Sequence, residues 1–272
     1  MRRIFSSYRS FFFLVALLLI CKLGPPISAV SFPDGYTSSD CLNGLKKLAE
    51  QEGIKIKEDF KIIVGAPIPY DHPDTTHPGH YYKDARLLLP PDIDLDSVAA
   101  AFSLFFPKES IKEKLETAKK QGKQSIDLME LLPSFVREKI GARAECKGPN
   151  CWNTTLNVHN PSTGIRFTSE AQMEEELDRN YSRLGPGETL RPGDVLVIRA
   201  TDNYGEPPSL DHTAIYLGNG LIFHKRSWLQ TDPYAIETFD QKFKTYKNFV
   251  ETNVQFYRYK SGHSAIGGNA AH

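Results

Sequence analysis

The sequence has no excess of charge of either sign, no internal repeats and no basic patch with interleaved aromatic residues. Its 33 lysines and arginines equal its 33 aspartates and glutamates. The lack of a basic surface argues against nucleic acid as the main partner. Beyond a short apolar run near the N-terminus, the sequence contains no apolar run of membrane length, so we expect no stable membrane span in the rest of the chain.

Residues 1–31 have the pattern of an export signal. Basic residues precede an unbroken apolar run over residues 11–20, and the small residues Ala29 and Ser31 offer cleavage positions. The run is shorter than the roughly 20 residues of a membrane-spanning helix. We therefore expect a periplasmic or secreted protein, with an uncleaved anchor as the alternative. Without the four basic residues of this segment, 29 basic residues face 33 acidic ones, a net charge of −4.

Three cysteines follow the signal segment, namely Cys41, Cys146 and Cys151. In an exported protein an odd count leaves at least one thiol unpaired or paired between chains. An oxidising compartment permits a Cys41–Cys146 disulfide, which would leave Cys151 free. A Cys146–Cys151 bridge is the alternative, and the cysteine count alone does not separate the two.

Residues 32–145 are predicted to form a mainly helical N-terminal region. Residues 61–64 form a short strand-like run, and the proline-rich residues 66–92 are expected to form an ordered loop or strap. Capping residues and apolar spacing predict helices that begin near Ser39, Asp94, Pro107 and Ser125, and the helix from Asp94 is expected to run through Phe106.

Residues 146–260 have a different pattern, in which helices precede strands. Helices are predicted to start at Cys151, after a Gly-Pro turn, and at Ser169, which can cap one. Asn219-Gly220 is typical of a tight hairpin turn. Helices followed by an antiparallel sheet indicate an α+β fold, and residues 261–272 are expected to be a flexible tail. Strands are predicted over residues 195–198, 213–217, 221–224 and 254–259.

Cys151, His212 and His224 are the candidate catalytic residues. A thiol hydrolase needs a thiolate, a base that generates it, and a third group that orients the base. At the start of a helix, Cys151 would have its pKa lowered by the helix dipole and could offer its backbone N–H to an oxyanion. His212 and His224 lie at the open ends of one predicted hairpin and should therefore be near each other. Lys225 or Asn153 could take the role of His224 instead.

The motifs around these residues resemble those of a known family. Residues 191–195 read Arg-Pro-Gly-Asp-Val, and residues 211–224 read Asp-His-Thr-Ala-Ile-Tyr-Leu-Gly-Asn-Gly-Leu-Ile-Phe-His. This order resembles the NlpC/P60 cell-wall peptidases of the papain-like superfamily, over roughly residues 148–227. Residues 148–153 read Gly-Pro-Asn-Cys-Trp-Asn, whereas that family usually has Asp before the cysteine and Ser-Gly after it.

The resemblance implies a fold and a mechanism. The fold would be a papain-like core over residues 146–260, with a helix that bears Cys151 packed on an antiparallel sheet. Cys151 would be the nucleophile, His212 the base and His224 the orienting residue. The protein would cleave an amide or peptide bond, first among peptidoglycan stem peptides, without a cofactor or metal. A non-catalytic envelope binding module and a thiol acyltransferase are the alternatives.

A metal site is a weaker alternative. His72, His77 and His80 lie in the proline-rich segment, but their spacing is looser than that of typical zinc ligands. A zinc hydrolase built on them is therefore the least favoured hypothesis.

Overall fold

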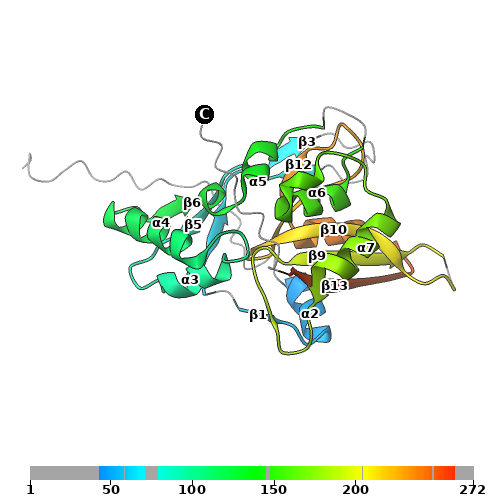
Figure 1. Ribbon diagram of the computed structural model, residues 1–272, viewed down its shortest axis with the longest axis horizontal. Helices are drawn as coiled ribbons and strands as arrows, with labels where there is room; N and C mark the ends of the chain where they lie inside the picture. The colour runs from blue at the N-terminus through cyan, green and yellow to red at the C-terminus, as the bar shows by residue number, and fades with distance from the viewer. Residues whose placement is uncertain are drawn as a thin grey trace, which may run out of the picture. The chain divides into compact units, whose positions relative to one another are not determined.

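A six-stranded sheet, antiparallel throughout, forms the centre of the fold in the computed structural model (Figure 1), with strand order β12-β11-β10-β9-β13-β7. The strands are β7 (Tyr181–Arg183), β9 (Val195–Thr201), β10 (Ser209–Gly218), β11 (Leu221–Lys225), β12 (Tyr234–Thr238) and β13 (Glu251–Tyr259). The structure describes residues 43–57, 59–70, 79–144, 148–203, 205–246 and 248–260. Among them, no helix is long and apolar enough to cross a membrane.

Both faces of this sheet are buried. Val195 and Val197 belong to one apolar cluster, together with residues of α6 (Cys151–His159) and α7 (Glu170–Asn180). Leu196 and Ile198 belong to a second cluster, with residues of α2 (Asn43–Gln51) and α8 (Phe239–Phe243). Figure 1 shows α6 and α7 on one side of the sheet and α2 on the other. A strand covered on both faces reads as a continuous apolar run, which is why residues 195–198 show no alternation.

The described part of the N-terminal region is mixed rather than mainly helical. It contains helices α3 (Leu95–Ala101), α4 (Lys108–Lys120), η2 (Leu128–Leu131) and α5 (Ser134–Lys139). Its strands are β1 (Lys55–Ile56), β2 (Ile62–Val64), β3 (Ile68–Tyr70), β4 (Gly79–Tyr81), β5 (Ala85–Leu88) and β6 (Ser125–Asp127). Strands β2, β5 and β6 form an antiparallel sheet, β3 pairs with β4, and β1 pairs in parallel with β8 (Thr189–Leu190).

Several helix predictions for this region need correction. Ser125 begins strand β6 rather than a helix, because Ile126 is buried opposite Leu87 and Arg86 Nε donates to Ser125 Oγ at 3.0 Å. The proline-rich segment contains β3, β4 and β5. The helix capped by Asp94 ends at Ala101, before the expected residue 106. The helix after Pro107 is confirmed as α4, whereas Ser39 lies outside the described residues.

One apolar cluster crosses the expected boundary near residue 145. It joins Ile62, Leu87 and Leu115 of the N-terminal region to Val195 and Phe223 of the central sheet. Strand β4 also lies beside β12, since the Tyr82 backbone N–H donates to the carbonyl of Ile236 at 2.8 Å. The N-terminal region is therefore packed directly against the sheet that carries the two candidate histidines.

The Pro-Gly-Asp turn before β9 is held by a buried carboxylate. Asp194 is fully buried and accepts hydrogen bonds from the Arg191 backbone N–H at 2.7 Å and from Arg258 Nε and Nη2 at 2.9 and 2.7 Å. Gly193 has φ of +100°, and a Cβ there would lie 2.7 Å from Leu104 Cβ. The turn thus needs glycine both for its backbone angle and for the close approach of Leu104.

Replacing Gly193 should therefore destabilise the fold more than replacing a glycine in open space. Gly122 also has positive φ, +72°, but a Cβ there would meet nothing within 4 Å. We expect Gly122→Ala to lower the free energy of unfolding by about 1 kcal/mol, and Gly193→Ala to lower it by about 1–3 kcal/mol more. Urea unfolding of both variants measures the difference. Equal losses would contradict the packing argument.

Candidate active site

Cys151 lies at the N-terminus of α6, as the sequence predicted. Asn150 caps this helix: its Oδ1 accepts from the Asn153 backbone N–H at 3.0 Å, and its Nδ2 donates to the carbonyl of Thr168 at 2.7 Å. The Thr155 and Thr213 hydroxyls are hydrogen-bonded at 2.8 Å and so join α6 to β10. This contact joins the second turn of α6 to the strand that carries His212.

The thiol of Cys151 is free and almost completely buried, with 6% of the residue exposed. A Cys146–Cys151 bridge is thus not present, whereas Cys41 and Cys146 lie outside the described residues. Burial raises the pKa of the thiol to about 11, although hydrogen bonding from the backbone of Thr213 opposes this shift. The expectation that the helix start lowers this pKa is therefore wrong for the resting site, because exclusion of water outweighs the helix terminus.

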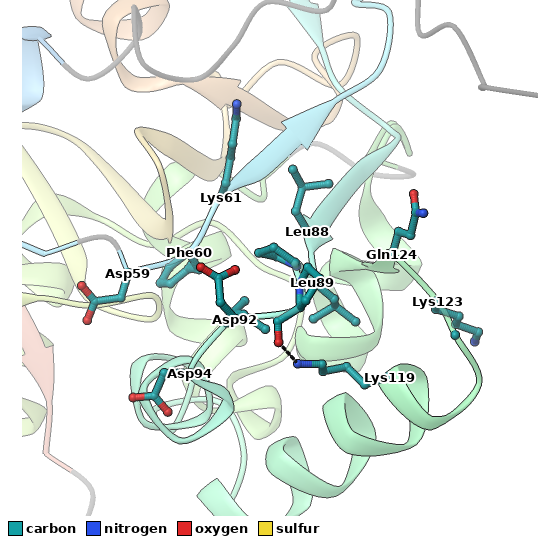
Figure 2. Close-up of a pocket in the computed structure, with 14 residues that line it drawn as sticks. Asp59, Phe60, Lys61, Leu88, Leu89, Asp92, Asp94, Lys119, Lys123 and Gln124 are labelled. Atoms are coloured by element: carbon teal, nitrogen blue, oxygen red, sulfur yellow. Dashed lines mark hydrogen bonds between the residues drawn. The ribbon is translucent and has the colours of Figure 1, made fainter.

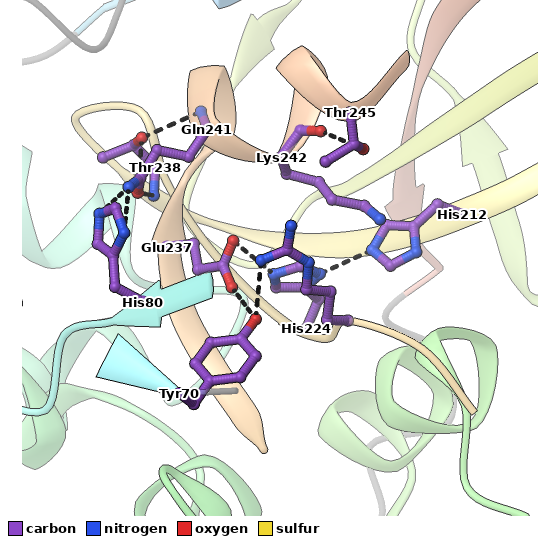
Figure 3. Close-up of polar contacts among 10 residues, drawn as sticks. Tyr70, His80, His212, His224, Glu237, Thr238, Gln241, Lys242 and Thr245 are labelled. Carbon is purple, nitrogen blue, oxygen red and sulfur yellow. Dashed lines mark hydrogen bonds and ion pairs between the residues drawn. The ribbon is translucent and has the colours of Figure 1, made fainter. Parts of the chain in front are cut away.

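His212 and His224 are in direct contact across the β10–β11 hairpin. Both side chains are buried, and His212 Nε2 lies 2.7 Å from His224 Nδ1 (Figure 3). Their rings meet edge to face, with centroids 4.9 Å apart. The proximity expected from the Asn219-Gly220 turn is confirmed. The sequence could not predict whether the two side chains touch, because the β10–β11 pairing register shifts between Tyr216 and Gly218.

The surroundings of His224 indicate which nitrogen carries the proton. His224 Nε2 lies 3.7 Å from Glu237 Oε2, and an ionised carboxylate can only accept. A proton on His224 Nε2 therefore faces Glu237 and leaves His224 Nδ1 as the acceptor for a proton on His212 Nε2. His212 Nδ1 then keeps its lone pair. That tautomer is the one a general base requires.

Glu237 was not identified from the sequence. It lies on β12, with 2% of the residue exposed, and accepts a hydrogen bond from the Tyr70 hydroxyl at 2.9 Å. Arg226 Nη1 donates to the same hydroxyl at 3.1 Å. Burial acts to raise the pKa of Glu237, but His224, Arg226 and Tyr70 together lower it to about 2. All five residues of β12 are buried, so no alternation marked residues 234–238 as a strand in the sequence.

Lys242 is a second residue that sequence reasoning missed. It comes from α8, with 7% of the residue exposed, and its ammonium points toward the His212 ring in Figure 3. Its Nζ lies 5.2 Å from the centroid of the Tyr246 ring. Burial lowers the pKa of His212 well below its usual value, and the positive charges of Lys242 and Arg226 add to this effect. The resting site thus holds a neutral imidazole and a neutral thiol.

Neither alternative to His224 reaches His212. Asn153 Nδ2 donates to the carbonyl of Gly164 at 3.0 Å. Lys225 is buried, and its Nζ donates to the carbonyl of Ser227 at 3.0 Å. Both side chains hold loops near the site instead of orienting the base.

The structure describes only one of the three histidines considered for a metal site. His80 contacts Gln241 on α8, whereas His72 and His77 lie outside the described residues. No group of three metal-ligating side chains is found in the described ranges of the chain.

A cavity of about 1020 Å³ lies away from these residues, in the N-terminal region (Figure 2). Its lining comes from residues 59–61, 88–94, 119 and 122–124, and Lys119 Nζ donates to the carbonyl of Pro91 at 2.8 Å. None of the three candidate catalytic residues lines it, so it is separate from the candidate active site.

No protein-family model matches the chain, and no curated protein matches its sequence.

The buried histidines should make the protein less stable as the pH falls. Burial lowers the pKa of His212 and His224, and lowers that of His159 to about 4. Below about pH 6.5 the unfolded chain therefore binds more protons than the folded one, and the free energy of unfolding falls with decreasing pH. Urea unfolding between about pH 7.5 and pH 5 measures this slope.

His159→Gln tests the origin of the slope. His159 Nε2 is 2.8 Å from the carbonyl of Gly193 and Nδ1 is 3.0 Å from the Tyr181 hydroxyl, contacts that glutamine can reproduce in part. The variant should show a smaller slope, because one depressed pKa is removed. Stability that is constant or increases as the pH falls across this window would contradict the assignment.

Alkylation of Cys151 should follow its raised pKa. With a pKa of about 11, we expect the rate of reaction with iodoacetamide to keep rising above the free-thiol pKa of about 8.5. The rate near neutral pH should be at least about tenfold lower than in the urea-unfolded chain. Peptide mass spectrometry separates Cys151 from the other cysteines. A rate that levels off below about pH 8.5 would instead indicate a thiolate–imidazolium pair.

Proposed function

We propose that this protein is an exported cysteine hydrolase of the papain-like NlpC/P60 type, which cleaves an amide or peptide bond through an acyl-enzyme on Cys151. The observation that carries the proposal is the 2.7 Å contact between His212 Nε2 and His224 Nδ1. His212 lies on β10, the strand to which the Cys151 helix is joined through the hydrogen bond between Thr155 and Thr213. A free thiol at a helix start and a base with a defined tautomer are two of the groups that covalent acyl transfer requires.

The proton is transferred as the thiol attacks. Because the resting thiol and imidazole are both neutral, His212 Nδ1 takes the Cys151 proton while the sulfur bonds to the substrate carbonyl carbon. His212 then gives that proton to the leaving amine, and the carbon–nitrogen bond breaks. Water then attacks the thioester carbon while His212 takes a proton from it. The carbon–sulfur bond breaks, the product leaves with a free carboxyl group, and His212 returns the proton to the Cys151 sulfur. During these steps, the hydrogen bond between His212 Nε2 and His224 Nδ1 keeps the His212 ring oriented. The Glu237 carboxylate, which faces His224 Nε2, orients His224 in turn.

The start of α6 supplies one donor for the oxyanion. The first backbone N–H groups of a helix have no partner within the helix. Asn150 Oδ1 accepts from the Asn153 N–H, which leaves the Cys151 N–H directed out of the helix end. A carbonyl oxygen held there would gain stabilisation as it becomes negative.

Peptidoglycan stem peptides are the first substrates to test. This choice comes from the resemblance of residues 191–195 and 211–224 to the cell-wall peptidases, and from the export signal pattern in residues 1–31. The proposed reaction needs neither a metal nor a cofactor.

A non-catalytic binding module on the same fold is a second candidate. It is favoured by the 6% exposure of Cys151 and by the raised pKa of its thiol, which both describe an unreactive cysteine. In that case the His212–His224 pair would serve stability alone, and the protein would bind stem peptides without cleaving them.

Activity of single variants separates the two candidates. With peptidoglycan fragments and stem peptides analysed by mass spectrometry, we expect Cys151→Ala to lose turnover completely and His212→Ala to lose about 10²–10⁴-fold in kcat. His224→Ala should lose about 10–100-fold, as for a residue that orients a base. His159→Gln is the matched control, since His159 is hydrogen-bonded through both nitrogens but lies at the other end of α6.

The products also distinguish hydrolysis from transfer. Hydrolysis yields a free carboxylate, whereas an acyltransferase supplied with an added amine yields a new amide. If stem peptides bind but Cys151→Ala has the same product profile as the unaltered protein, the binding module replaces the hydrolase.

A further inference from the structure

We infer that Glu170 and Tyr246 are positioning residues for His212, because they hold an irregularity in β10 that turns His212 toward His224. This inference deepens the proposed function and rests on it for its kinetic test. The observations behind it are a β-bulge directly before His212 and two side-chain hydrogen bonds that reach the bulge from outside the sheet.

The bulge is visible in the register of β10 against β9. Leu210 lies opposite Arg199. His212, two positions later, lies opposite Ile198, only one residue away from Arg199 on β9. Asp211 is therefore an extra residue that has no partner on β9. Bulges of this kind are common beside active sites, where they redirect a side chain.

The bulge changes the face of the sheet on which His212 lies. In a regular strand, residues two positions apart lie on the same face. Leu210 belongs to the apolar cluster that includes Val197, whereas His212 lies opposite Ile198, which belongs to the cluster on the other face. If β10 paired regularly from Leu210 onward, His212 would lie opposite Val197 on the face of Leu210. The 2.7 Å contact with His224 would then be lost.

Glu170 holds the residue before the bulge. It is the first residue of α7, and its Oε1 accepts a hydrogen bond from the Leu210 backbone N–H at 2.8 Å. An acidic residue in the first turn also suits the helix dipole, but that effect needs no contact with β10. The contact has a consequence of its own, because it fixes the backbone at the point where the register changes.

Tyr246 holds the bulged residue itself. Its hydroxyl donates to the Asp211 carboxylate, and its ring packs against Phe243 and Phe249 with 5% of the residue exposed. Because packing fixes the tyrosine, the hydrogen bond fixes the Asp211 side chain and the backbone that leads into His212. Neither hydrogen bond to the bulge includes the thiol or an imidazole, so both residues act on the base through β10.

Imidazole NMR tests the position of His212 without a substrate. In the full chain with isotope-labelled histidine, His212 should carry a proton on Nε2 and none on Nδ1 at about pH 7.5, because Nε2 contacts His224. The signal is assigned by its loss in His212→Gln. Glu170→Ala and Tyr246→Phe should each shift or broaden it, because the ring is no longer held in one orientation.

Kinetics separate positioning from substrate binding. On a peptide that the unaltered protein cleaves, Glu170→Ala and Tyr246→Phe should lower kcat by about 10–100-fold and change KM by no more than about twofold. Glu170→Gln keeps an acceptor oxygen for the Leu210 N–H. It should therefore recover most of kcat and the His212 signal.

Glu175→Ala and Tyr257→Phe are the matched controls. Glu175 lies on the same helix and pairs with Arg179, and the Tyr257 hydroxyl donates to Gln255 Oε1 at 3.1 Å. Neither side chain is hydrogen-bonded to β10 among the described residues, so both variants should keep the His212 signal and kcat. Urea unfolding shows which variants are folded and can be compared.

The outcomes are distinct. An unchanged His212 signal with unchanged kcat in Glu170→Ala and Tyr246→Phe would overturn the inference. Equal losses in Glu170→Gln and Glu170→Ala would also overturn it, since the acceptor oxygen would then not matter. If Glu170→Ala does not fold, the signal in Tyr246→Phe decides. If the unaltered protein cleaves no peptide, the proposed function fails, and the NMR comparison still shows whether the two residues position His212.

Discussion

The candidate site depends on one constraint. A series of polar side chains is buried at the edge of an apolar core, so these side chains must find their hydrogen-bond and charge partners among one another. His212, His224 and Glu237 are each almost completely inaccessible to water. Buried polar groups are costly unless they are hydrogen-bonded. The hydrogen bonds between His212 and His224 and from Tyr70 to Glu237 meet that requirement in part. His224 Nε2 has no hydrogen-bond partner among the described residues and instead faces the Glu237 carboxylate at 3.7 Å. The same contacts set the tautomer of His212, so the condition for stability and the condition for base catalysis coincide.

The N-terminal region takes part in this network and is more than a cover. Tyr70 of β3 reaches the Glu237 carboxylate, and β4 lies beside β12 through the bond from Tyr82 to Ile236. The apolar cluster shared by the two regions fixes this arrangement. The orientation of His212, the proposed base, is therefore linked through His224 and Glu237 to Tyr70, which lies 142 positions before His212 in the sequence.

The proposed nucleophile is buried in the same way. The Cys151 thiol is excluded from water and its pKa is raised to about 11, while the pKa of His212 is lowered. A neutral pair of this kind does not need a separate counter-ion in the resting state.

The local features of the site could be predicted from the sequence, and the features that depend on long-range packing could not. The helix start at Cys151 and the hairpin at Asn219-Gly220 depend on capping and turn residues a few positions apart, so the proximity of His212 to His224 followed from the sequence. The strand nature of Ser125–Asp127 did not, because it depends on pairing with β5. Glu237 and Lys242 were also missed.

Only the tertiary structure determined the positions of Glu237 and Lys242 at the site and the raised pKa of the Cys151 thiol. Glu237 lies on a strand that is buried at every residue, and Lys242 on a short helix, so neither has a periodic signal. The sequence predicted a helix terminus that lowers the pKa of Cys151, but the amount of water excluded from the thiol is set by segments that meet only in the folded chain. Capping and turn chemistry are local and can be read along the sequence, whereas burial and charge pairing arise from distant residues and appear only when the chain has folded.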